Sequence, residues 1–506
     1  MKVSPARAAR ICACAAAAVA IAVGPACAPV AAPPPQTALP PTTRLTTAPP
    51  PPLPSVAPNP AFYPIAGLVE NAIAAHRLPG AVVQVGHAGT IAYRRAFGDR
   101  KLPGEPGLDG APAPAEPMTE DTIFDLASLT KSLATTVAVL QLHERGRLGI
   151  DDAVQTYLPE FNPADDPERA GVTLRMLLTH SSGLGGDLSH QGPWGLAAPD
   201  KAAGLHRAFT STFEFPPGAG FHYSDINFIL LGEMVERLTG EPLDRYVHDH
   251  VFGPLGMTET RYLPVAKACG PHRIRGNALA PDPHAEANSP CPADGWSTDL
   301  LARIAPTAHD GDTPGINPDF GQLLRGTVHD PTARRMGGVA GSAGVFATVT
   351  DVGRYAQALL DRLAGRPSAF PLAPATAQLM ASPQQPGHDP AQLEAANTAT
   401  RAAIASTPDR ADPLLAPSYP AVPGQPLRSL GWDIDTLHSM PRGLIFPIGS
   451  IGHTGFTGVT LWIDPGSDTY VVVLANVIHQ PGGPPISSLS GDIATVAARA
   501  LHLYGS

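Results

Sequence analysis

The chain has 506 residues, 43% of them hydrophobic, and a formal net charge of -10. These values are ordinary for a soluble globular protein of one large domain or two. Acidic and basic residues are interspersed, so we expect neither a basic groove for nucleic acid nor an acidic tail. Much of the high content of Pro and Gly, 59 and 50 residues, marks the ends of the chain and its loops.

The first residues have the pattern of an export signal. Lys2, Arg7 and Arg10 precede an Ala/Val/Ile run that ends in small residues. This run is a poor candidate for a membrane span, which needs roughly 20 apolar residues. Cys27, in VGPAC, resembles the modified cysteine of a bacterial lipobox, and both lipidation of Cys27 and simple cleavage nearby stay open. We assign residues 1–27 to a signal peptide and expect a protein of the cell envelope or a secreted one.

A Pro-rich segment follows at residues 28–60. It has almost nothing to bury, so it is expected to be an extended, disordered linker. From residue 61 to residue 506 we expect one folded body. The body begins with a predicted helix at 65–76 and a predicted hairpin, GAVVQVGHAG and TIAYRRAFG, joined by a Gly turn.

The rest of the body divides into a helical middle and a strand-rich end. Residues 128–257 carry apolar residues at helical spacing, and Gly240 ends the last of these helices. Residues 268–329 and 383–425 are rich in turn-forming residues and predict long loops, with a helix in DVGRYAQALLDRLAG between them. SLGWDID, VTLWIDP and TYVVVLANV predict strands, and ISSLSGDIATVAARALHLY a final helix. Strands at both ends imply one sheet closed by the two ends of the chain.

Two cysteines lie in the body. Three of the five cysteines precede residue 28, which leaves Cys269 and Cys291. In an oxidising compartment these two form one disulfide that closes a loop. A zinc site with His272 and His284 is the weaker alternative, because the spacings match no usual ligand pattern.

A candidate nucleophile lies in FDLASLTKS. Residues three apart on a helix share a face, with Cβ atoms about 5 to 6 Å apart, so Ser128 and Lys131 can touch. A Ser nucleophile with a Lys partner requires that spacing. The first turn of a helix also offers free N–H groups and a positive dipole end for a developing oxyanion. Alone the motif is weak, and a Ser that only caps a helix is the alternative.

Two further segments change that balance. GAGFHYSDINF places Tyr223 and Asp225 at the start of a helix, and SIGHTGFTGVTLWIDP places His453, Thr454 and Gly455 on a predicted strand. The three segments, in this order, resemble the S-x-x-K, Y-x-N and K/H-T-G boxes of the serine β-lactamase and penicillin-binding superfamily, specifically its class C-like branch. The resemblance extends to LLTHSSGL, PLGM and MGGVAGSAGVFATVTDVGRYAQALL and covers about residues 68–501.

The resemblance implies an α/β (α+β) fold, with an antiparallel sheet flanked by helices beside an all-helical subdomain. It implies that Ser128 is acylated, that Lys131 is its proton partner and that Tyr223 is the general acid/base. His453, Thr454 and Gly455 would line the strand edge that holds substrate, and the oxyanion hole would use backbone N–H groups of Ser128 and Phe456. We expect no metal or cofactor, a small-molecule or peptidoglycan-type substrate, and a monomer.

Two departures from the family pattern concern the substrate. Asp225 stands where the family often has Asn, and a carboxylate there favours the ammonium form of Lys131. His453 stands where many members have Lys, and it is a poorer anchor for a carboxylate because it is only fractionally charged near pH 7. Both changes favour an esterase, whereas export and the Tyr-Ser-Asp form favour a D-Ala-D-Ala carboxypeptidase.

Two other interpretations stay open. Ser342, in AGSAG, is a degenerate nucleophile elbow, and Asp464 and His479 follow in the order of an α/β-hydrolase. The second is a catalytically silent domain that binds cell wall or acts as a sensor. The complete set of Ser128, Lys131 and Tyr223 argues against a silent domain, because a binding protein does not need all three.

Overall fold

The computed structural model describes residues 59–282, 291–385, 426–480 and 486–506, together with residue 54 and scattered residues between 391 and 420. The predicted signal peptide with Cys27, nearly all of the predicted linker and most of the 383–425 segment therefore lie outside the described residues. Within the described residues, no helix is both long enough and apolar enough to cross a membrane.

The centre of the fold is an antiparallel sheet built from both ends of the chain. The strand order is β13-β14-β15-β16-β17-β1-β2-β3. The pairing of β1 with β17, from Ala81 opposite Ala475 to His87 opposite Thr469, joins the two ends in the middle of the sheet. The single sheet predicted from the sequence is thus confirmed. Its strands are β1 (Gly80–His87), β2 (Thr90–Lys101), β3 (Glu116–Pro117), β13 (Leu427–Arg428), β14 (Asp433–Asp435), β15 (Ile451–Gly455), β16 (Val459–Asp464) and β17 (Thr469–Ala475).

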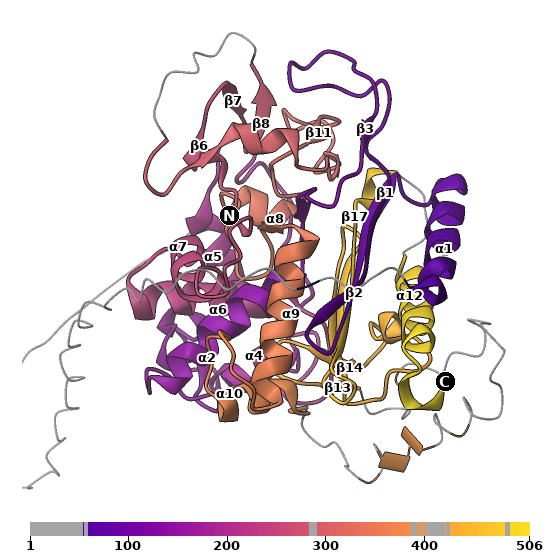
Figure 1. Ribbon diagram of the computed structural model, residues 1–506. Coiled ribbons are helices and arrows are strands. Elements are labelled where there is room, and N and C mark those ends of the chain that lie inside the picture. The colour runs from indigo at the N-terminus through magenta and orange to yellow at the C-terminus, as the bar shows by residue number, and fades with distance from the viewer. Residues whose placement is uncertain are drawn as a thin grey trace, which may run out of the picture. The chain divides into compact units, whose positions relative to one another are not determined.

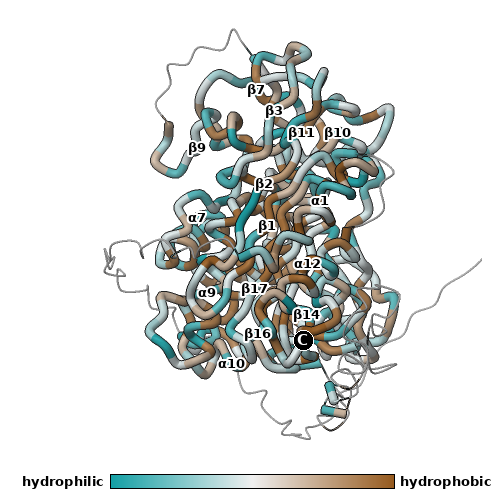
Figure 2. Tube along the Cα trace, turned by 45° about the vertical axis from the view of Figure 1, so that its right-hand side comes forward, coloured by the Kyte–Doolittle hydropathy of each residue, from teal (hydrophilic) through white to brown (hydrophobic). Residues whose placement is uncertain are grey.

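Alternation along the strands gives the sheet two buried faces. Successive side chains of a strand point to opposite faces, so Val471 and Val473 pack with α1 (Tyr63–Ala74) and α12 (Ser487–Ala500). Tyr470, Val472 and Leu474 instead join the core under α9 (Val349–Leu363). Figure 1 shows α1 and α12 together on one side of the sheet and α9 on the other, and Figure 2 shows hydrophobic residues gathered along β1 and β17.

Between β4 (Phe124–Asp125) and β5 (Arg261–Tyr262) the chain consists of helices joined by loops. Their apolar residues share one large core with the α9 face of the sheet. Gly240 ends α6 in the left-handed conformation, as predicted. The helices are α2 (Thr136–Glu144), α3 (Pro167–Ala170), α4 (Leu174–Leu178), α5 (Lys201–Phe209), α6 (Asp225–Thr239) and α7 (Leu243–Val247), and α10 (Pro374–Ala381) packs against α9.

The segment predicted as a long loop at 268–329 contains short strands. Each has only two to four residues, too few to show a two-residue period in the sequence. Cys269 is bonded to Cys291 with a Cα–Cα distance of 5.3 Å, so neither is available as a zinc ligand. The elements are β6 (Ala268–Cys269), β7 (His272–Arg275), β8 (Ala278–Pro281), β9 (Trp296–Ser297), β10 (Ala308–His309) and β11 (Leu323–Leu324), then α8 (Pro331–Arg335) and β12 (Val345–Ala347).

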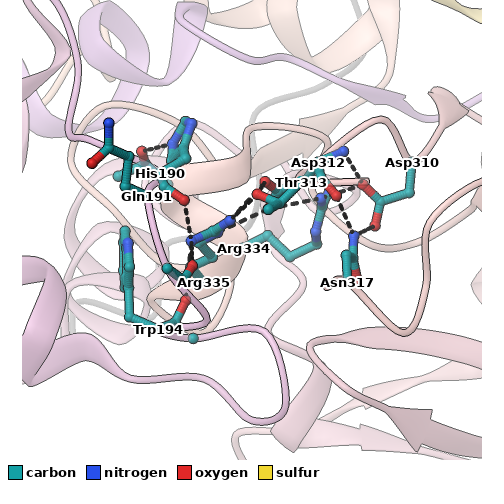
Figure 3. A network of polar contacts seen from close by, with 12 residues as sticks. His190, Gln191, Trp194, Asp310, Asp312, Thr313, Asn317, Arg334 and Arg335 are labelled. Carbon is teal, nitrogen blue, oxygen red and sulfur yellow. Dashed lines mark hydrogen bonds and ion pairs between the residues drawn. The ribbon is translucent and has the colours of Figure 1, made fainter. Parts of the chain in front are cut away.

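A buried network of ion pairs ties this segment to α8 (Figure 3). Arg335 binds both carboxylate oxygens of Asp312, at 2.8 and 2.7 Å, and donates to the Trp194 carbonyl. Arg334 donates to Asp310 at 2.6 Å. All four charged side chains are almost fully buried. Because Arg335 also donates to the carbonyl oxygens of His190 and Gly192, the network ties α8 to the segment before β11 and to the loop at residues 190–194.

Candidate active site

Ser128 lies at the turn between β4 and a helix. Ala127 has φ +44°, a left-handed conformation that is uncommon for a residue with a side chain, and helical backbone begins directly after Ser128. The Asp125 carboxylate holds the turn by accepting from the N–H of Ala127 at 2.9 Å and from that of His329 at 2.8 Å. Ser128 is thus presented at the N-terminus of a helix, as predicted, although its first turns include a π-helical turn at Lys131–Thr135.

Lys131 is buried and points its ammonium at Ser128. Its Nζ lies 2.9 Å from Ser128 Oγ, 2.9 Å from the carbonyl oxygen of Ser342 and 2.5 Å from Asp225 Oδ1. Burial alone would lower the pKa of Lys131, but the Asp225 carboxylate, with a further contribution from Tyr223, raises it above its usual value. Lys131 is therefore held as an ammonium at neutral pH, as the carboxylate at position 225 led us to expect.

Tyr223 lies immediately before α6, beside both Ser128 and Lys131. Lys131 Nζ is 5.1 Å from the centre of its ring. Burial raises the pKa of Tyr223, and the Lys131 ammonium acts in the opposite direction. The ring of His180 lies 4.4 Å from that of Tyr223, and His180 Nδ1 accepts from the N–H of Ser224 at 3.1 Å. His180 therefore helps to position Tyr223.

Strand β15 forms the opposite side of the site. His453 is buried, and its Nδ1 lies 2.7 Å from the Thr454 carbonyl oxygen. Burial, followed by the charges of Arg428 and Lys131, keeps the pKa of His453 well below its usual value, so the ring is neutral. At Gly455 an added Cβ would lie 2.5 Å from the Leu126 carbonyl oxygen. Glycine is required here because β15 approaches the Ser128 turn so closely.

Ser128, Tyr223, His453 and Thr454 line one pocket of about 260 Å³. Tyr223, Ser128 and the β15 side chains face it, and Phe456, at the end of β15, is exposed at its rim and lies against His329. Three lining residues were not identified from the sequence, because each lies outside the three motifs. They are Arg428, Asp433 and His438. The one feature of the sequence that could have pointed to them is that a charged or titratable side chain lies close to the apolar residues of a buried strand.

Two further carboxyl groups lie near Asp225. Asp187 accepts from the Thr332 hydroxyl and the N–H of Leu188, and Asp330 caps α8. Burial and the charge of Asp225 raise the pKa of Asp187 to about 6, and burial with the charges of Asp187 and Asp225 raises that of Asp330 to about 7. Asp225 is thus the carboxylate of this group that contacts Lys131 directly.

The arrangement has the parts needed for acyl transfer. A hydroxyl at a helix N-terminus contacts an ammonium, and a phenol lies beside both. A Ser oxygen in this position can attack a carbonyl carbon, and the ammonium with the helix N-terminus can stabilise the negative charge that develops. In the part of the chain that the structure describes, no group of three or more His, Cys, Asp or Glu side chains is arranged to hold a metal ion.

The α/β-hydrolase interpretation is wrong. The sheet is antiparallel, and Ser342 is followed by β12 rather than directly by a helix. Asp464 binds Ser467 and Tyr504, and His479 pairs with Glu105 at 2.7 Å, so they do not form a triad with Ser342. Ser342 contributes its carbonyl oxygen to Lys131 instead.

Two curated bacterial proteins are similar to this chain over most of its length. A protein of Escherichia coli (strain K12) named "Putative D-alanyl-D-alanine carboxypeptidase" is 30% identical over 408 residues, 78% of this chain and 77% of that protein. A protein of the same name from Salmonella typhimurium (strain LT2) is 27% identical over 406 residues, 78% of each chain.

Solved structures share the fold. A penicillin-binding protein homologue from Caulobacter crescentus matches with a TM-score of 0.57 and 18% identity, over 88% of this chain and 99% of that one. A mutant of simvastatin synthase from Aspergillus terreus matches with a TM-score of 0.56 and 24% identity, over 87% and 96%. The family model described as Beta-lactamase matches residues 65–485. The chain therefore belongs to the β-lactamase family of serine hydrolases and has its β-lactamase/transpeptidase-like fold.

Proposed function

We propose that this protein is an exported serine hydrolase that forms a covalent acyl-enzyme on Ser128, and that it acts as a D-Ala-D-Ala carboxypeptidase. The observation that carries the proposal is the 2.9 Å contact between Ser128 Oγ and Lys131 Nζ at a helix N-terminus, with Tyr223 in the same pocket. These three residues come from one chain, which supports a site that is complete in a single copy, and we propose a monomer.

In the proposed reaction, Ser128 Oγ attacks the carbonyl carbon of the scissile bond. Lys131 is already an ammonium and cannot accept the Ser128 proton. The proton goes instead to Tyr223, which reacts as the phenolate, and the Lys131 charge stabilises both the phenolate and the Ser128 oxygen as it loses its proton. Backbone N–H groups of Ser128 and Phe456 hold the oxyanion. Tyr223 then returns its proton to the leaving group, and water, activated by the same phenolate, hydrolyses the acyl-enzyme.

A peptide ending in D-Ala-D-Ala is the proposed substrate. The names of the Escherichia coli and Salmonella relatives support it, as does the predicted export signal, because an exported bacterial enzyme meets peptidoglycan. The pocket of about 260 Å³ lies below the usual range for drug-sized ligands, which suits a small leaving group such as one amino acid.

Hydrolysis of simple esters is the second candidate function. The neutral state of His453 favours it, since the family position that often holds a Lys cation here carries no charge. An ester also has a better leaving group than an amide and makes less demand on the acid Tyr223.

The test is to incubate the purified protein with a fluorophosphonate and, separately, with a penicillin, and to locate the added mass by peptide mapping. A tag on Ser128 from both reagents, absent in Ser128→Ala, is expected. Fluorophosphonate on Ser128 with neither a penicillin adduct nor penicillin turnover favours the esterase. A tag elsewhere, or none from either reagent, contradicts the proposal, and the second result is the one expected of a silent binding domain.

A further inference from the structure

The segment that carries Tyr223 is held from both sides by one histidine. The N–H of His222 donates to the His180 carbonyl oxygen at 2.8 Å, and the N–H of Ser224 donates to His180 Nδ1 at 3.1 Å. The His180 ring also lies 4.4 Å from the Tyr223 ring, with an angle of 31° between the ring planes. Tyr223 is thus fixed by its ring and by the amide on each side of it.

The backbone of His180 adopts an unusual conformation to make these three contacts. Its φ of +55° lies in the left-handed region, which is uncommon for any residue other than glycine. Glycine fits this conformation most easily, but it has neither a ring nor an acceptor atom in its side chain. A side chain held at such a position points to a need for the side chain itself.

One of these hydrogen bonds decides which nitrogen of His180 carries the proton. A backbone N–H can only donate, so Nδ1, which accepts from Ser224, must have a free lone pair. Burial, followed by the charges of Arg428 and Lys131, keeps the pKa of His180 well below its usual value, so the ring is neutral. Its single proton is therefore on Nε2, which has no hydrogen-bond partner among the described residues.

Two further buried side chains favour the same tautomer of His180. The N–H of Leu184 donates to Ser182 Oγ at 3.2 Å, and Ser182 Oγ donates to Asn227 Oδ1 at 2.6 Å. Because its carbonyl oxygen is occupied, Asn227 turns its amide nitrogen to His180, and Nδ2 lies 3.3 Å from His180 Nδ1. An amide nitrogen only donates. Every hydrogen bond in this chain therefore runs toward the lone pair of Nδ1.

We propose that Ser182 and Asn227 are positioning residues for the acyl transfer, because they fix the His180 tautomer that holds Tyr223 where it exchanges a proton with Ser128. This inference rests on the proposed Ser128 chemistry and deepens it. Within the part of the chain that the structure describes, none of Ser182, Asn227 and His180 lines the pocket, so their effect reaches the substrate only through Tyr223. A displacement of about 1 Å at a reacting group can cost about 10²-fold in rate.

Asn227→Asp tests the tautomer directly. A carboxylate at this position accepts and does not donate, so it should place a proton on His180 Nδ1 and leave the N–H of Ser224 without its acceptor. Nitrogen NMR of the imidazole groups reports the change, and the His180 signals are assigned by their absence in His180→Asn. Nδ1 is expected to have the chemical shift of a nitrogen with a lone pair in the wild type and that of a protonated nitrogen in Asn227→Asp.

Hydrolysis of p-nitrophenyl acetate measures the consequence for the reaction. Asn227→Asp is expected to lower kcat by about 10- to 100-fold and to change KM by less than about threefold, because the ester still binds while Tyr223 is displaced. His180→Phe keeps a ring but has no acceptor and is expected to lose as much activity. His180→Asn tolerates the left-handed backbone and keeps an acceptor for the N–H of Ser224, so it is expected to retain more activity than His180→Phe.

Two neighbouring serines provide a matched pair of variants. Ser182→Ala removes the donor that orients the Asn227 amide and is expected to lower kcat by about 3- to 10-fold. Ser181 is as buried as Ser182, but its Oγ lies 2.9 Å from Thr179 Oγ1 and does not contact Asn227. Ser181→Ala is therefore the control, and its kcat is expected to stay within about twofold of the wild type. Circular dichroism identifies any variant that fails to fold.

Three results would overturn the inference. The first is a proton on His180 Nδ1 in the wild type, a measurement that needs no variant of the chain to fold. The second is a wild-type kcat in Asn227→Asp although the nitrogen shift has changed, and the third is an equal loss in Ser181→Ala and Ser182→Ala. Because the NMR measurement needs no substrate, a wild-type protein that is not labelled at Ser128 would count against the proposed function alone.

Discussion

Asp225 sets the charge state of the candidate site. It contacts Lys131 at 2.5 Å and, with Tyr223, outweighs the effect of burial, so that the pKa of Lys131 is raised. An amine that keeps its proton cannot act as a base, and the proposed reaction depends on phenolate at Tyr223, whose own pKa is raised. We therefore expect kcat/KM of the wild-type protein to rise with pH throughout the neutral range.

Asp225→Asn tests this charge balance. The amide keeps the shape of the side chain and removes the negative charge, so burial should lower the pKa of Lys131 and provide a neutral amine. The acidic limb of the pH profile of kcat/KM for p-nitrophenyl acetate is expected to move to lower pH by about one unit or more. A profile identical to that of the wild type would show that Asp225 does not control the base.

Asp125, beneath the nucleophile, links the site to stability. Burial raises its pKa to about 6, although the N–H groups of His329 and Ala127 favour the charged form. The folded protein therefore binds a proton that the unfolded chain, with a carboxyl pKa near 3.9, has already lost. The resulting stabilisation is complete below about pH 4 and is lost as pH rises through about 6.

Asp125→Asn removes this titration. The free energy of unfolding of the wild type, relative to that of Asp125→Asn, is expected to fall by about 3 kcal/mol between pH 4 and pH 8. Urea unfolding of both proteins across this range measures the difference. The amide also loses one acceptor for a backbone N–H, a cost that does not depend on pH. A difference independent of pH would contradict the raised pKa.

At the scale of elements, α8 is held by its two buried arginines (Figure 3). Arg335→Gln would leave the Asp312 carboxylate buried without its partner, and this change is expected to lower the free energy of unfolding by about 3 to 5 kcal/mol. Arg95→Gln, which breaks the exposed pair with Glu70, is the control and should cost no more than about 1 kcal/mol. Similar costs in urea unfolding for both variants would show that the network adds little.

The sequence predicted those helices and strands that are long enough to show a repeating pattern of apolar residues. The hairpin of β1 and β2, the strands β16 and β17, and the helices α1, α6, α9 and α12 all carry a clear period over enough residues. The short strands between β5 and β12 show no such pattern. Tertiary contacts, such as the Cys269–Cys291 disulfide and the Arg335–Asp312 pair, hold them in place instead. Ionic partners far apart in the sequence leave no local pattern.

The same reasoning applies to the site. Ser128 and Lys131 are three residues apart, so local helix geometry alone brought them together in the prediction. Tyr223 and His453 could be placed only through the resemblance, because they follow Ser128 in the sequence by 95 and 325 residues. Arg428 belongs to no motif, and its place in the pocket becomes visible only when β13 and β14 are paired in the sheet.

For the whole molecule, the central pairing of β1 with β17 makes both ends of the folded body indispensable. Removal of residues 1–47, which lie outside the body Ala48–Ser506, is expected to leave the melting temperature and the Ser128 labelling rate unchanged. Removal of residues 486–506 takes away α12 and exposes Val471 and Val473, so this variant should not fold. Thermal unfolding with labelling measures both, and a stable, active C-terminal deletion would contradict the fold.

The central claim is that Ser128 carries the acyl group of a substrate whose departing half bears a carboxylate. The most direct measurement is intact-protein and peptide mass spectrometry after rapid quenching of the protein with an acyl-D-Ala-D-lactate depsipeptide, with release of lactate followed in parallel. We predict an added acyl-D-Ala mass on Ser128 in the wild type, and neither adduct nor lactate in Ser128→Ala. Lactate release by Ser128→Ala, or an adduct on any other residue, would contradict the account.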